Sequence, residues 1–191
     1  MPASAKTNQL RIIGGRHRGR RLPFPDQEGL RPTSDRVRET LFNWVAPIIE
    51  GARCLDVFSG SGALGFEAAS RGAGEVVMLE RAPKVVRQLR CNVETLALEA
   101  VSIHQADSLE WLDRPGRPFD LIFLDPPFAD DLLESACARL AANGWLAPGS
   151  RIYLESAAKP GFPNLPADWD LVREKTAGQV LYGLAIVADA A

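Results

Sequence analysis

Cysteine is scarce in this sequence and its spacing excludes two classes of site. The three cysteines, Cys54, Cys91 and Cys137, form no C-x-x-C pair and are odd in number. This argues against a disulfide framework and against a structural zinc site. We therefore expect three reduced cysteines in the core, and no metal.

Long apolar runs are also missing. No run approaches the roughly 18 residues that a membrane-spanning helix needs, and the first ten residues, MPASAKTNQL, lack the apolar core of a signal peptide. We therefore expect a cytoplasmic protein that does not associate with membranes. With 191 residues, 46% of them hydrophobic, the chain is long enough for one globular core with a small appendage.

Charge is unevenly distributed along the chain. The net charge is −2, yet six cations and no acid lie between Lys6 and Arg21, a pattern that favours an arm binding phosphate groups. Such a block is also typical of a solvated tail, but the apolar residues of LRIIGG and RRLPF favour a short ordered hairpin. We predict a basic arm or hairpin over residues 1–29 and a main domain over residues 30–191.

The main domain opens with an amphipathic helix and continues as alternating strands and helices. RPTSDRVRETLFNWVAPII offers Thr33 or Ser34 as N-cap and predicts a helix that ends near Gly51. The alternation that follows is typical of a mostly parallel sheet covered on both faces. The strand-like runs are residues 53–58, 75–80, 101–105, 121–125 and 151–156, and the helical patterns are residues 63–71, 84–96 and 132–142.

The last two strand-like runs have no helix between them. WDLVREKTAG and QVLYGLAIV meet at Ala177 and Gly178. They predict an antiparallel hairpin on the edge of the sheet.

A glycine-rich turn follows the first strand of the sheet. In LDVFSGSGALG, Gly60, Gly62 and Gly65 form a G-x-G-x-x-G, where missing side chains let a ligand approach backbone N–H groups. Glu80 ends the next strand twenty residues after Gly60, the place of an acid that binds ribose hydroxyls. The pattern fits a dinucleotide, and glycines with a purely structural role would also produce it.

Two further acids favour S-adenosylmethionine over a dinucleotide. Asp56 lies four residues before Gly60, near enough to meet an amino group, which a methionine moiety has and a nicotinamide dinucleotide lacks. Asp107 follows the third strand in QADSLEWL and could accept a hydrogen bond from an adenine amine. We therefore expect the cofactor at the carboxyl ends of these strands.

The stretch FLDPPF ends the fourth strand with a carboxylate and a stiff turn. An amine needs acceptors for both hydrogens before its lone pair can face an electrophile. Asp125 can accept one hydrogen bond and the carbonyl of Pro126 the other, while proline rings at Pro126 and Pro127 fix the backbone. Phe128 could stack on a base. A helix-capping aspartate in a rigid loop is the alternative.

These motifs resemble those of known enzymes. LDVFSGSGALGFEA, MLER, QADS and LDPPF are similar to the ordered motifs of class I S-adenosylmethionine-dependent amino methyltransferases. RIIGGRHRGRRL, RPTSDRVRETLFNWV, YLES and LYGLAIV resemble the bacterial 16S rRNA guanine-N2 methyltransferases of the ribosomal RNA small subunit methyltransferase D family. The resemblance covers nearly the whole chain. It implies a Rossmann-like α/β fold with seven strands, one of them antiparallel.

The resemblance also implies an activity and assigns residues to it. A monomer would transfer a methyl group from S-adenosylmethionine to the exocyclic N2 amine of a guanine in 16S rRNA, within an assembled or assembling small ribosomal subunit. Catalysis would fall to Asp125, Pro126, Pro127 and Phe128. The expected cofactor contacts are Asp56, Ser59, Gly60, Gly62, Glu80, Arg81, Asp107 and Ser108, and the expected RNA contacts are Arg11, Arg16, Arg18, Arg20 and Arg21.

Several alternatives remain open at this point. A DNA-adenine N6 methyltransferase would share DPPF, and a protein-glutamine methyltransferase has Asn where this chain has Asp125. A nonenzymatic RNA-binding module would explain the basic arm but not the glycines or DPPF. Ser34, Arg36 and Arg38 could cap a helix or line a surface that faces RNA.

Overall fold

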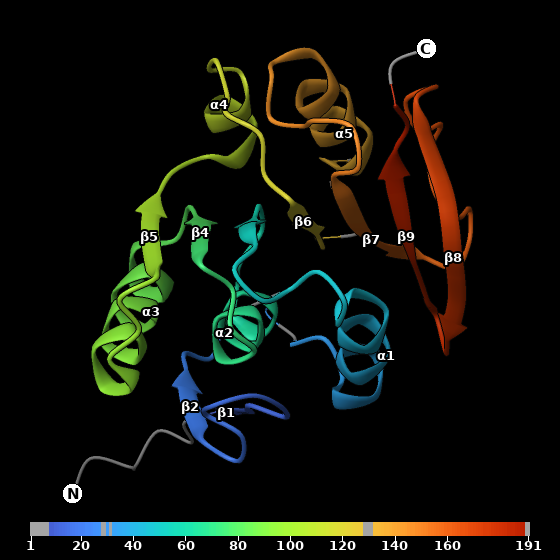
Figure 1. Cartoon of the computed structure of the whole chain (residues 1–191). Helices are drawn as coiled ribbons and strands as arrows, with labels where there is room; N and C mark the ends of the chain where they lie inside the picture. The colour runs from blue at the N-terminus through green and yellow to red at the C-terminus, as the bar shows by residue number, and fades with distance from the viewer. Residues whose placement is uncertain (1–7, 28–29, 31, 128–131, 190–191) are drawn as a thin grey trace, which may run out of the picture.

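The computed structural model describes residues 8–27, 30, 32–127 and 132–189, and Figure 1 shows strands and helices in an α/β arrangement. The strands of the main sheet are β3 (Arg53–Asp56), β4 (Glu75–Glu80), β5 (Val101–Gln105), β6 (Leu121–Leu124), β7 (Arg151–Ala157), β8 (Trp169–Ala177) and β9 (Val180–Val187). The helices are α1 (Asp35–Val45), α2 (Ala63–Ser70), α3 (Pro83–Leu96), α4 (Ser108–Leu112) and α5 (Leu132–Ala142). Two more strands, β1 (Asn8–Arg11) and β2 (Arg21–Phe24), form a separate hairpin.

The main sheet has the order β5–β4–β3–β6–β7–β9–β8. Neighbouring strands from β5 through β7 are parallel, whereas β9 is antiparallel to both β7 and β8. The prediction of a Rossmann-like sheet of seven strands with an antiparallel edge hairpin is confirmed. The chain runs outward from β3 to β5 and then returns to β6 on the other side of β3. In sheets of this kind, ligands bind at the carboxyl ends of the strands where the order reverses, which here are β3 and β6.

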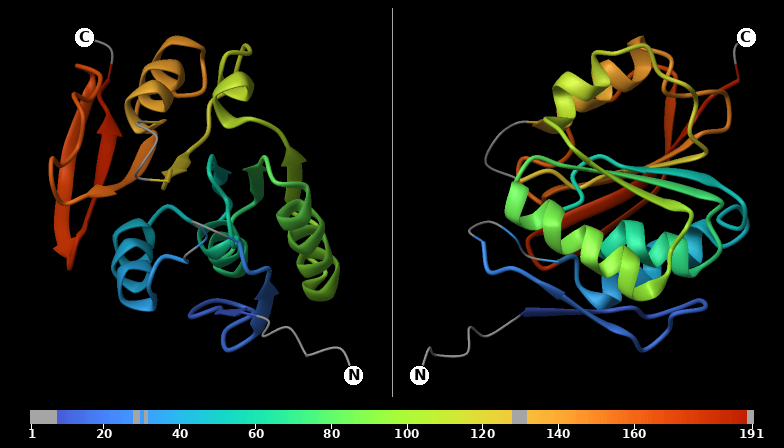
Figure 2. Two further views of the ribbon diagram at one scale, coloured as in Figure 1. Left: turned by 180° about the vertical axis from the view of Figure 1, so that it is seen from behind. Right: turned by 90° about the vertical axis from the view of Figure 1, so that its left-hand side faces the viewer.

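Helices cover both faces of the sheet, as its apolar strands require. Figures 1 and 2 show α1, α2 and α3 on one face and α4 and α5 on the other. Because side chains alternate along a strand, Phe123 and Tyr153 are buried under α1 to α3, whereas Ile122 and Leu124 are buried on the α4 and α5 side. Within the described residues, no helix is long and apolar enough to cross a bilayer.

The β1–β2 hairpin packs against the α1 to α3 layer. Leu10, Ile12, Leu22 and Phe24 are buried in the same apolar cluster as these helices, and the hairpin lies beneath them in Figure 1. At the tip, Gly15 has a φ of +74°, and a Cβ there would lie 1.9 Å from the carbonyl oxygen at the end of α2. The ordered hairpin is therefore joined to the core, and the division of the chain at residue 29 stays a prediction.

A buried arginine ties the hairpin to two helices. Arg38 is only 1% exposed, and its guanidinium donates to Asp35 Oδ1 at 2.6 Å, to the Arg11 carbonyl oxygen at 2.9 Å and to Glu67 Oε2 at 3.4 Å. Arg71 Nε donates to the other oxygen of Glu67 at 2.8 Å. Removing one partner of such a buried network costs about 3–5 kcal/mol, because a buried charge is left uncompensated. Arg38 is therefore a structural residue.

Three expectations about local structure were inaccurate. Helix α1 ends at Val45 rather than near Gly51, because Pro47 lacks the N–H that a continuing helix needs. Helix α4 was not expected from the sequence. Cys54 and Cys137 are buried as expected, but Cys91 is exposed on α3.

Candidate active site

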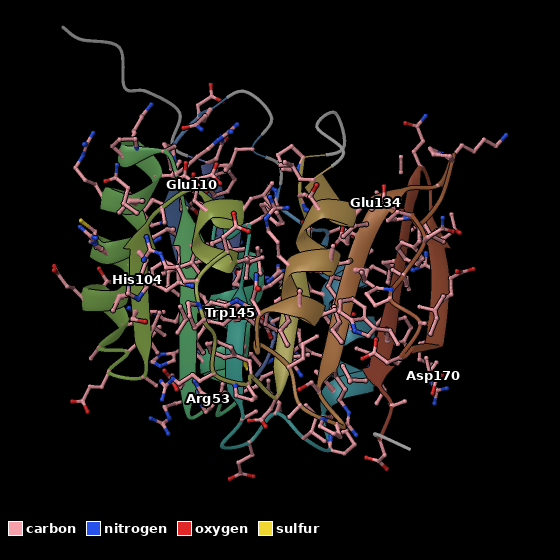
Figure 3. All side chains as sticks on the ribbon, turned by 90° about the horizontal axis from the view of Figure 1, so that it is seen from above. Arg53, His104, Glu110, Glu134, Trp145 and Asp170 are labelled. Carbon is pink, nitrogen blue, oxygen red and sulfur yellow. The ribbon has the colours of Figure 1, made fainter. Side chains whose placement is uncertain are left out.

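The predicted site residues of the main domain gather at the carboxyl ends of β3 to β6. In Figure 3 the strands run from the end marked by Arg53, at the start of β3, toward the end marked by Glu110, which follows β5. The loops after β3, β4, β5 and β6 all leave the sheet at that second end, because these strands are parallel. Within the described residues, no group of three His, Cys, Asp or Glu side chains is placed to hold a metal ion.

The glycine-rich turn after β3 needs its glycines for different reasons. Gly60 and Gly62 have φ angles of +49° and +83°, a backbone conformation that residues with a Cβ rarely adopt. A Cβ on Gly62 would also lie 2.4 Å from the ring of Phe66. A Cβ on Gly65, in α2, would lie 2.7 Å from Met78 Sδ, so Gly65 lets the helix pack closely on β4. The missing side chains at Gly62 and Gly65 therefore let the turn and α2 pack closely, and Gly60 remains half-buried at the carboxyl end of β3.

Glu80 holds this turn from the end of β4. Its Oε2 accepts a hydrogen bond from Gly60 N at 3.2 Å, and its Oε1 accepts one from Ala82 N at 2.7 Å. The residue is half-buried. Each carboxylate oxygen can accept a second hydrogen bond, and a pair of ribose hydroxyls would supply two donors.

Asp56 is more deeply buried than the sequence suggested. It is 2% exposed, and its Oδ2 accepts a hydrogen bond from Gly65 N at 3.0 Å, in the first turn of α2. Burial, helped by the charge of Glu80, raises the pKa of Asp56 to about 7, although the hydrogen bond from Gly65 acts in the opposite direction. Asp56 therefore anchors the turn to the helix, and its contact with a cofactor amino group stays a prediction.

The loop after β5 borders a hollow of about 340 Å³. Arg81 and Asp107 line this hollow and are exposed. Asp107 Oδ1 caps α4 by accepting from Leu109 N at 2.9 Å and Glu110 N at 3.1 Å, which leaves Oδ2 for another partner. Two predicted serines face inward instead: Ser59 Oγ donates to the Asp56 carbonyl and Ser108 Oγ to the Val57 carbonyl. The serines hold the loops that border the hollow.

Asp125 lies directly after β6 and is held by a residue far away in the sequence. Its Oδ2 accepts a hydrogen bond from Thr33 Oγ1 at 3.1 Å, although the two residues are 92 positions apart. Asp125 is half-buried, Pro126 is buried and Pro127 is exposed. Phe128 lies outside the described residues. The Thr33 contact orients the carboxylate of Asp125 at the carboxyl end of β6, and its role as an acceptor for an amine stays a prediction.

Sequence reasoning missed a second carboxylate beside Asp125. Leu124 pairs with Leu154 in the β6–β7 ladder, so Asp125 and Glu155 are the next neighbours along it, on the face that carries Tyr153. Glu155 is 4% exposed, and its Oε1 accepts a hydrogen bond from the Tyr153 hydroxyl at 2.6 Å. One sequence signal could have revealed Glu155. It directly follows the apolar run RIYL, which is the next strand-like run in the sequence after the one that ends in DPPF.

Both carboxylates have raised pKa values. Burial raises the pKa of Asp125 well above its ordinary value, and the charge of Glu155 raises it further, whereas the hydrogen bond from Thr33 lowers it. Burial likewise raises the pKa of Glu155, against the hydrogen bond from Tyr153. Like charges held close together in a half-buried site favour keeping a proton on one of them. The pair therefore tends to hold one proton between its two carboxylates, and the remaining oxygens can accept hydrogen bonds from an amine.

The predicted RNA contacts lie on the N-terminal hairpin. Arg16, Arg18, Arg20 and Arg21 are exposed. Arg11 is also exposed but forms an ion pair with Asp35 Oδ2 at 2.8 Å. The apolar side chains of the hairpin point into the core, so its cations face outward.

Comparison with known proteins identifies the family. The family model described as "Conserved hypothetical protein 95" matches residues 10–186. "Ribosomal RNA small subunit methyltransferase D" of Escherichia coli (strain K12) is 50% identical over 183 residues, which cover 96% of this chain and 92% of that protein. A protein of the same name from Haemophilus influenzae is 48% identical over 92% of this chain and 93% of its own length.

Solved structures agree with the sequence comparison. The structure titled "Putative methyltransferase yhhF from Escherichia coli" superposes with a TM-score of 0.91 at 47% identity, covering 96% of this chain and 100% of that one. The expected methyltransferase fold class is confirmed. Since both the family model and relatives at about half identity span nearly the whole chain, the protein belongs to the ribosomal RNA small subunit methyltransferase D family.

Proposed function

We propose that the protein transfers a methyl group from S-adenosylmethionine to the exocyclic N2 amine of a guanine in 16S rRNA. The observation that carries this proposal is the carboxylate of Asp125, fixed by Thr33 at the end of β6. This strand is the direct neighbour of β3, which leads into the glycine-rich turn. An amine acceptor site and a cofactor site are thereby adjacent.

The residues around the glycine-rich turn fit S-adenosylmethionine. Glu80 would accept the ribose hydroxyls, the turn at Gly60 and Gly62 would border the cofactor, and Asp107 would accept from the adenine amine through its remaining oxygen. When bound, the cofactor supplies an electrophilic methyl group on a sulfonium. Arg81 and Asp107 border the hollow on the β5 side, where the adenine would lie.

Asp125 and Pro126 hold the target amine. Asp125 accepts one amine hydrogen and the Pro126 carbonyl the other, which turns the nitrogen lone pair toward the methyl group. The new C–N bond leaves the nitrogen with one proton too many, and Asp125 accepts that proton. Because burial and Glu155 raise its pKa, Asp125 is a better proton acceptor than an ordinary aspartate. The rest of the acceleration comes from positioning, since a bound, aligned pair of reactants avoids the entropic cost of meeting.

The exposed cations of the hairpin support an RNA substrate. Arg16, Arg18, Arg20 and Arg21 would bind backbone phosphates, which position a nucleic acid without reading its sequence. The target base must leave its stack to reach Asp125, and unstacking is cheapest in a loop. We propose that a monomer acts on 16S rRNA in the cytoplasm, within an assembled or assembling small ribosomal subunit.

The experiment that tests this proposal compares acceptors. Purified protein and S-adenosylmethionine with a labelled methyl group would be incubated with four acceptors. These are small ribosomal subunits lacking this methylation, the naked 16S rRNA, adenine-containing duplex DNA, and a glutamine peptide. Label in the rRNA of either ribosomal sample is the expected result. Label in DNA or peptide instead would overturn it, and cofactor binding without transfer to any acceptor would favour the nonenzymatic alternative.

A further inference from the structure

A second polar pocket lies outside the site described above. It has a volume of about 310 Å³ and opens between α1 and the β8–β9 hairpin, two elements that lie side by side in both Figure 1 and Figure 2. Arg36 and Thr40 line it from α1, Lys175 and Thr176 from β8, and Tyr182 from β9. Its volume far exceeds the about 15 Å³ of cavity that one water needs.

The pocket is lined by positive charge that no described residue compensates. Two cations line it and, among the residues that the structure describes, no acid does. Neither Arg36 nor Lys175 forms an ion pair with another described residue. The hydroxyl of Thr176 can add a hydrogen-bond donor, whereas that of Thr40 donates to the Arg36 carbonyl oxygen at 3.1 Å. Like charges around one hollow repel each other, and an anion between them would relieve that repulsion.

Helix stability gives no reason for the cation at Arg36. It is the second residue of α1, where the partial positive charge of the helix N-terminus disfavours a cation. Ser34 already caps the helix by accepting from Val37 N, and Arg38 is the arginine that serves the core. Arg36 is exposed. Its position therefore fits a ligand contact better than a structural role.

The pocket is one strand away from the amine acceptor site. Tyr182, in its wall, pairs with Glu155 in the β7–β9 ladder, and the rings of Tyr182 and Tyr153 lie 6.5 Å apart. On the other side, the segment that carries Thr33 leads directly into α1. A polynucleotide whose base reaches Asp125 would thus run its backbone past this pocket.

We propose that this pocket binds a backbone phosphate of the RNA next to the target nucleotide. The guanidinium of Arg36 can form paired hydrogen bonds with phosphate oxygens, and Lys175 adds a point charge. The inference rests on the proposed function and deepens it, because it makes α1 and the β8–β9 turn a second RNA contact, separate from the N-terminal hairpin. Its role is to hold the backbone while the base is turned into the site.

The test compares three single variants and one double variant. Arg36→Ala, Lys175→Ala and the double variant each remove charge from the pocket. Arg87→Ala removes the same charge from an exposed residue of α3, without an ion pair among the described residues. For each protein, we would measure KM and kcat on unmethylated small subunits, affinity for S-adenosylmethionine, and rRNA binding as a function of salt.

We expect the two pocket variants to raise KM for the ribosomal substrate several-fold and to leave cofactor affinity unchanged. Each lost phosphate contact should lower the slope of log affinity against log salt by about 0.7–0.9, and Arg87→Ala should change neither quantity. An unchanged KM and slope in the double variant, or an equal change in Arg87→Ala, would overturn the phosphate site. Failure of the wild-type protein to methylate rRNA would overturn the proposed function itself, so the two failures are distinguishable.

Discussion

Replacing Thr33 by valine isolates the hydrogen bond that orients Asp125. Valine has the shape of threonine but cannot donate, so the 3.1 Å contact with Asp125 Oδ2 is lost. A hydrogen bond to a charged group contributes about 1.5–3 kcal/mol. Because Asp125 is half-buried, water can replace part of the lost hydrogen bond, and we expect a loss of about 1–2 kcal/mol. At about 1.36 kcal/mol per factor of ten, kcat/KM should fall about 5- to 30-fold.

The same substitution should change the pH profile. The Thr33 hydrogen bond lowers the pKa of Asp125, which burial and Glu155 hold above its ordinary value. Thr33→Val therefore raises that pKa further, so that Asp125 becomes protonated at a higher pH than in the wild-type protein when the solution is acidified. The acidic limb of kcat/KM, measured by methyl incorporation into small subunits, should move to higher pH.

Two control substitutions separate this effect from general damage. Thr33→Ser keeps a hydroxyl and should retain the wild-type profile. Thr95→Val removes an exposed hydroxyl that donates only to the Cys91 carbonyl within α3, and should also leave the profile unchanged. A folded Thr33→Val protein with wild-type kcat/KM and an unshifted acidic limb would refute the role of Thr33.

Three more predictions concern the cofactor turn and the hairpin. Glu80→Gln should weaken S-adenosylmethionine binding about 10- to 100-fold in calorimetry, since a charged acceptor contributes about 1.5–3 kcal/mol; unchanged affinity would remove Glu80 from the site. The pKa of Asp56 is raised from 3.8 to about 7, so the protein takes up a proton on folding, and the stability that this supplies at low pH is lost as pH rises through about 7. Between pH 3.8 and about 7 the unfolding free energy of the wild-type protein should therefore fall as pH rises, and Asp56→Asn should reduce that fall by up to about 1.4 kcal/mol per pH unit. If unfolding free energies from urea titrations change with pH equally in both proteins, the assignment is contradicted. Replacing the exposed pair Arg16 and Arg18 by alanine should weaken rRNA binding and its salt dependence while cofactor affinity and unfolding stay unchanged; wild-type rRNA binding would make the hairpin a purely structural element.

Long periodic patterns in the sequence predicted most of the fold. The apolar strands of the parallel sheet and the helices between them are long enough to show their characteristic periods. The residues after Pro166 lack a helical spacing of apolar residues, which indicated the edge hairpin. Helix α4 was not predicted because its five residues, Ser108–Leu112, are too few to show a helical period. The end of α1 was misplaced because apolar spacing continued past Pro47, where the backbone could not follow.

The site could be predicted only where it follows from strand ends. Asp125 and Glu80 each come directly after an apolar run, and the parallel sheet brings such ends together. The partners of these residues could not be predicted in the same way. Thr33 reaches Asp125 across 92 positions, and Glu155 becomes its neighbour only through the pairing of β6 with β7. Contacts of this kind depend on register and on the path of a loop, which local patterns do not encode.

Three neighbouring residues at the start of α1 show the same limit. From the sequence, Ser34, Arg36 and Arg38 were equally able to cap a helix or to face RNA. In the structure Ser34 caps α1, Arg38 is buried against Glu67, and Arg36 points into a surface pocket. Helical spacing separates them by about 100° per residue, but which direction faces the core depends on the β1–β2 hairpin packed beneath.

The central claim is that Asp125 holds the N2 amine of an rRNA guanine for methylation. The most direct measurement is mass spectrometry of nucleosides from small subunits treated with S-adenosylmethionine and either wild-type protein or Asp125→Asn, with cofactor affinity measured for both. We predict N2-methylguanosine with the wild-type protein and, with Asp125→Asn, a loss of most of it at a cofactor affinity within a few-fold of wild type. A different methylated nucleoside from the wild-type protein, or near-normal N2-methylguanosine from Asp125→Asn, would contradict the claim.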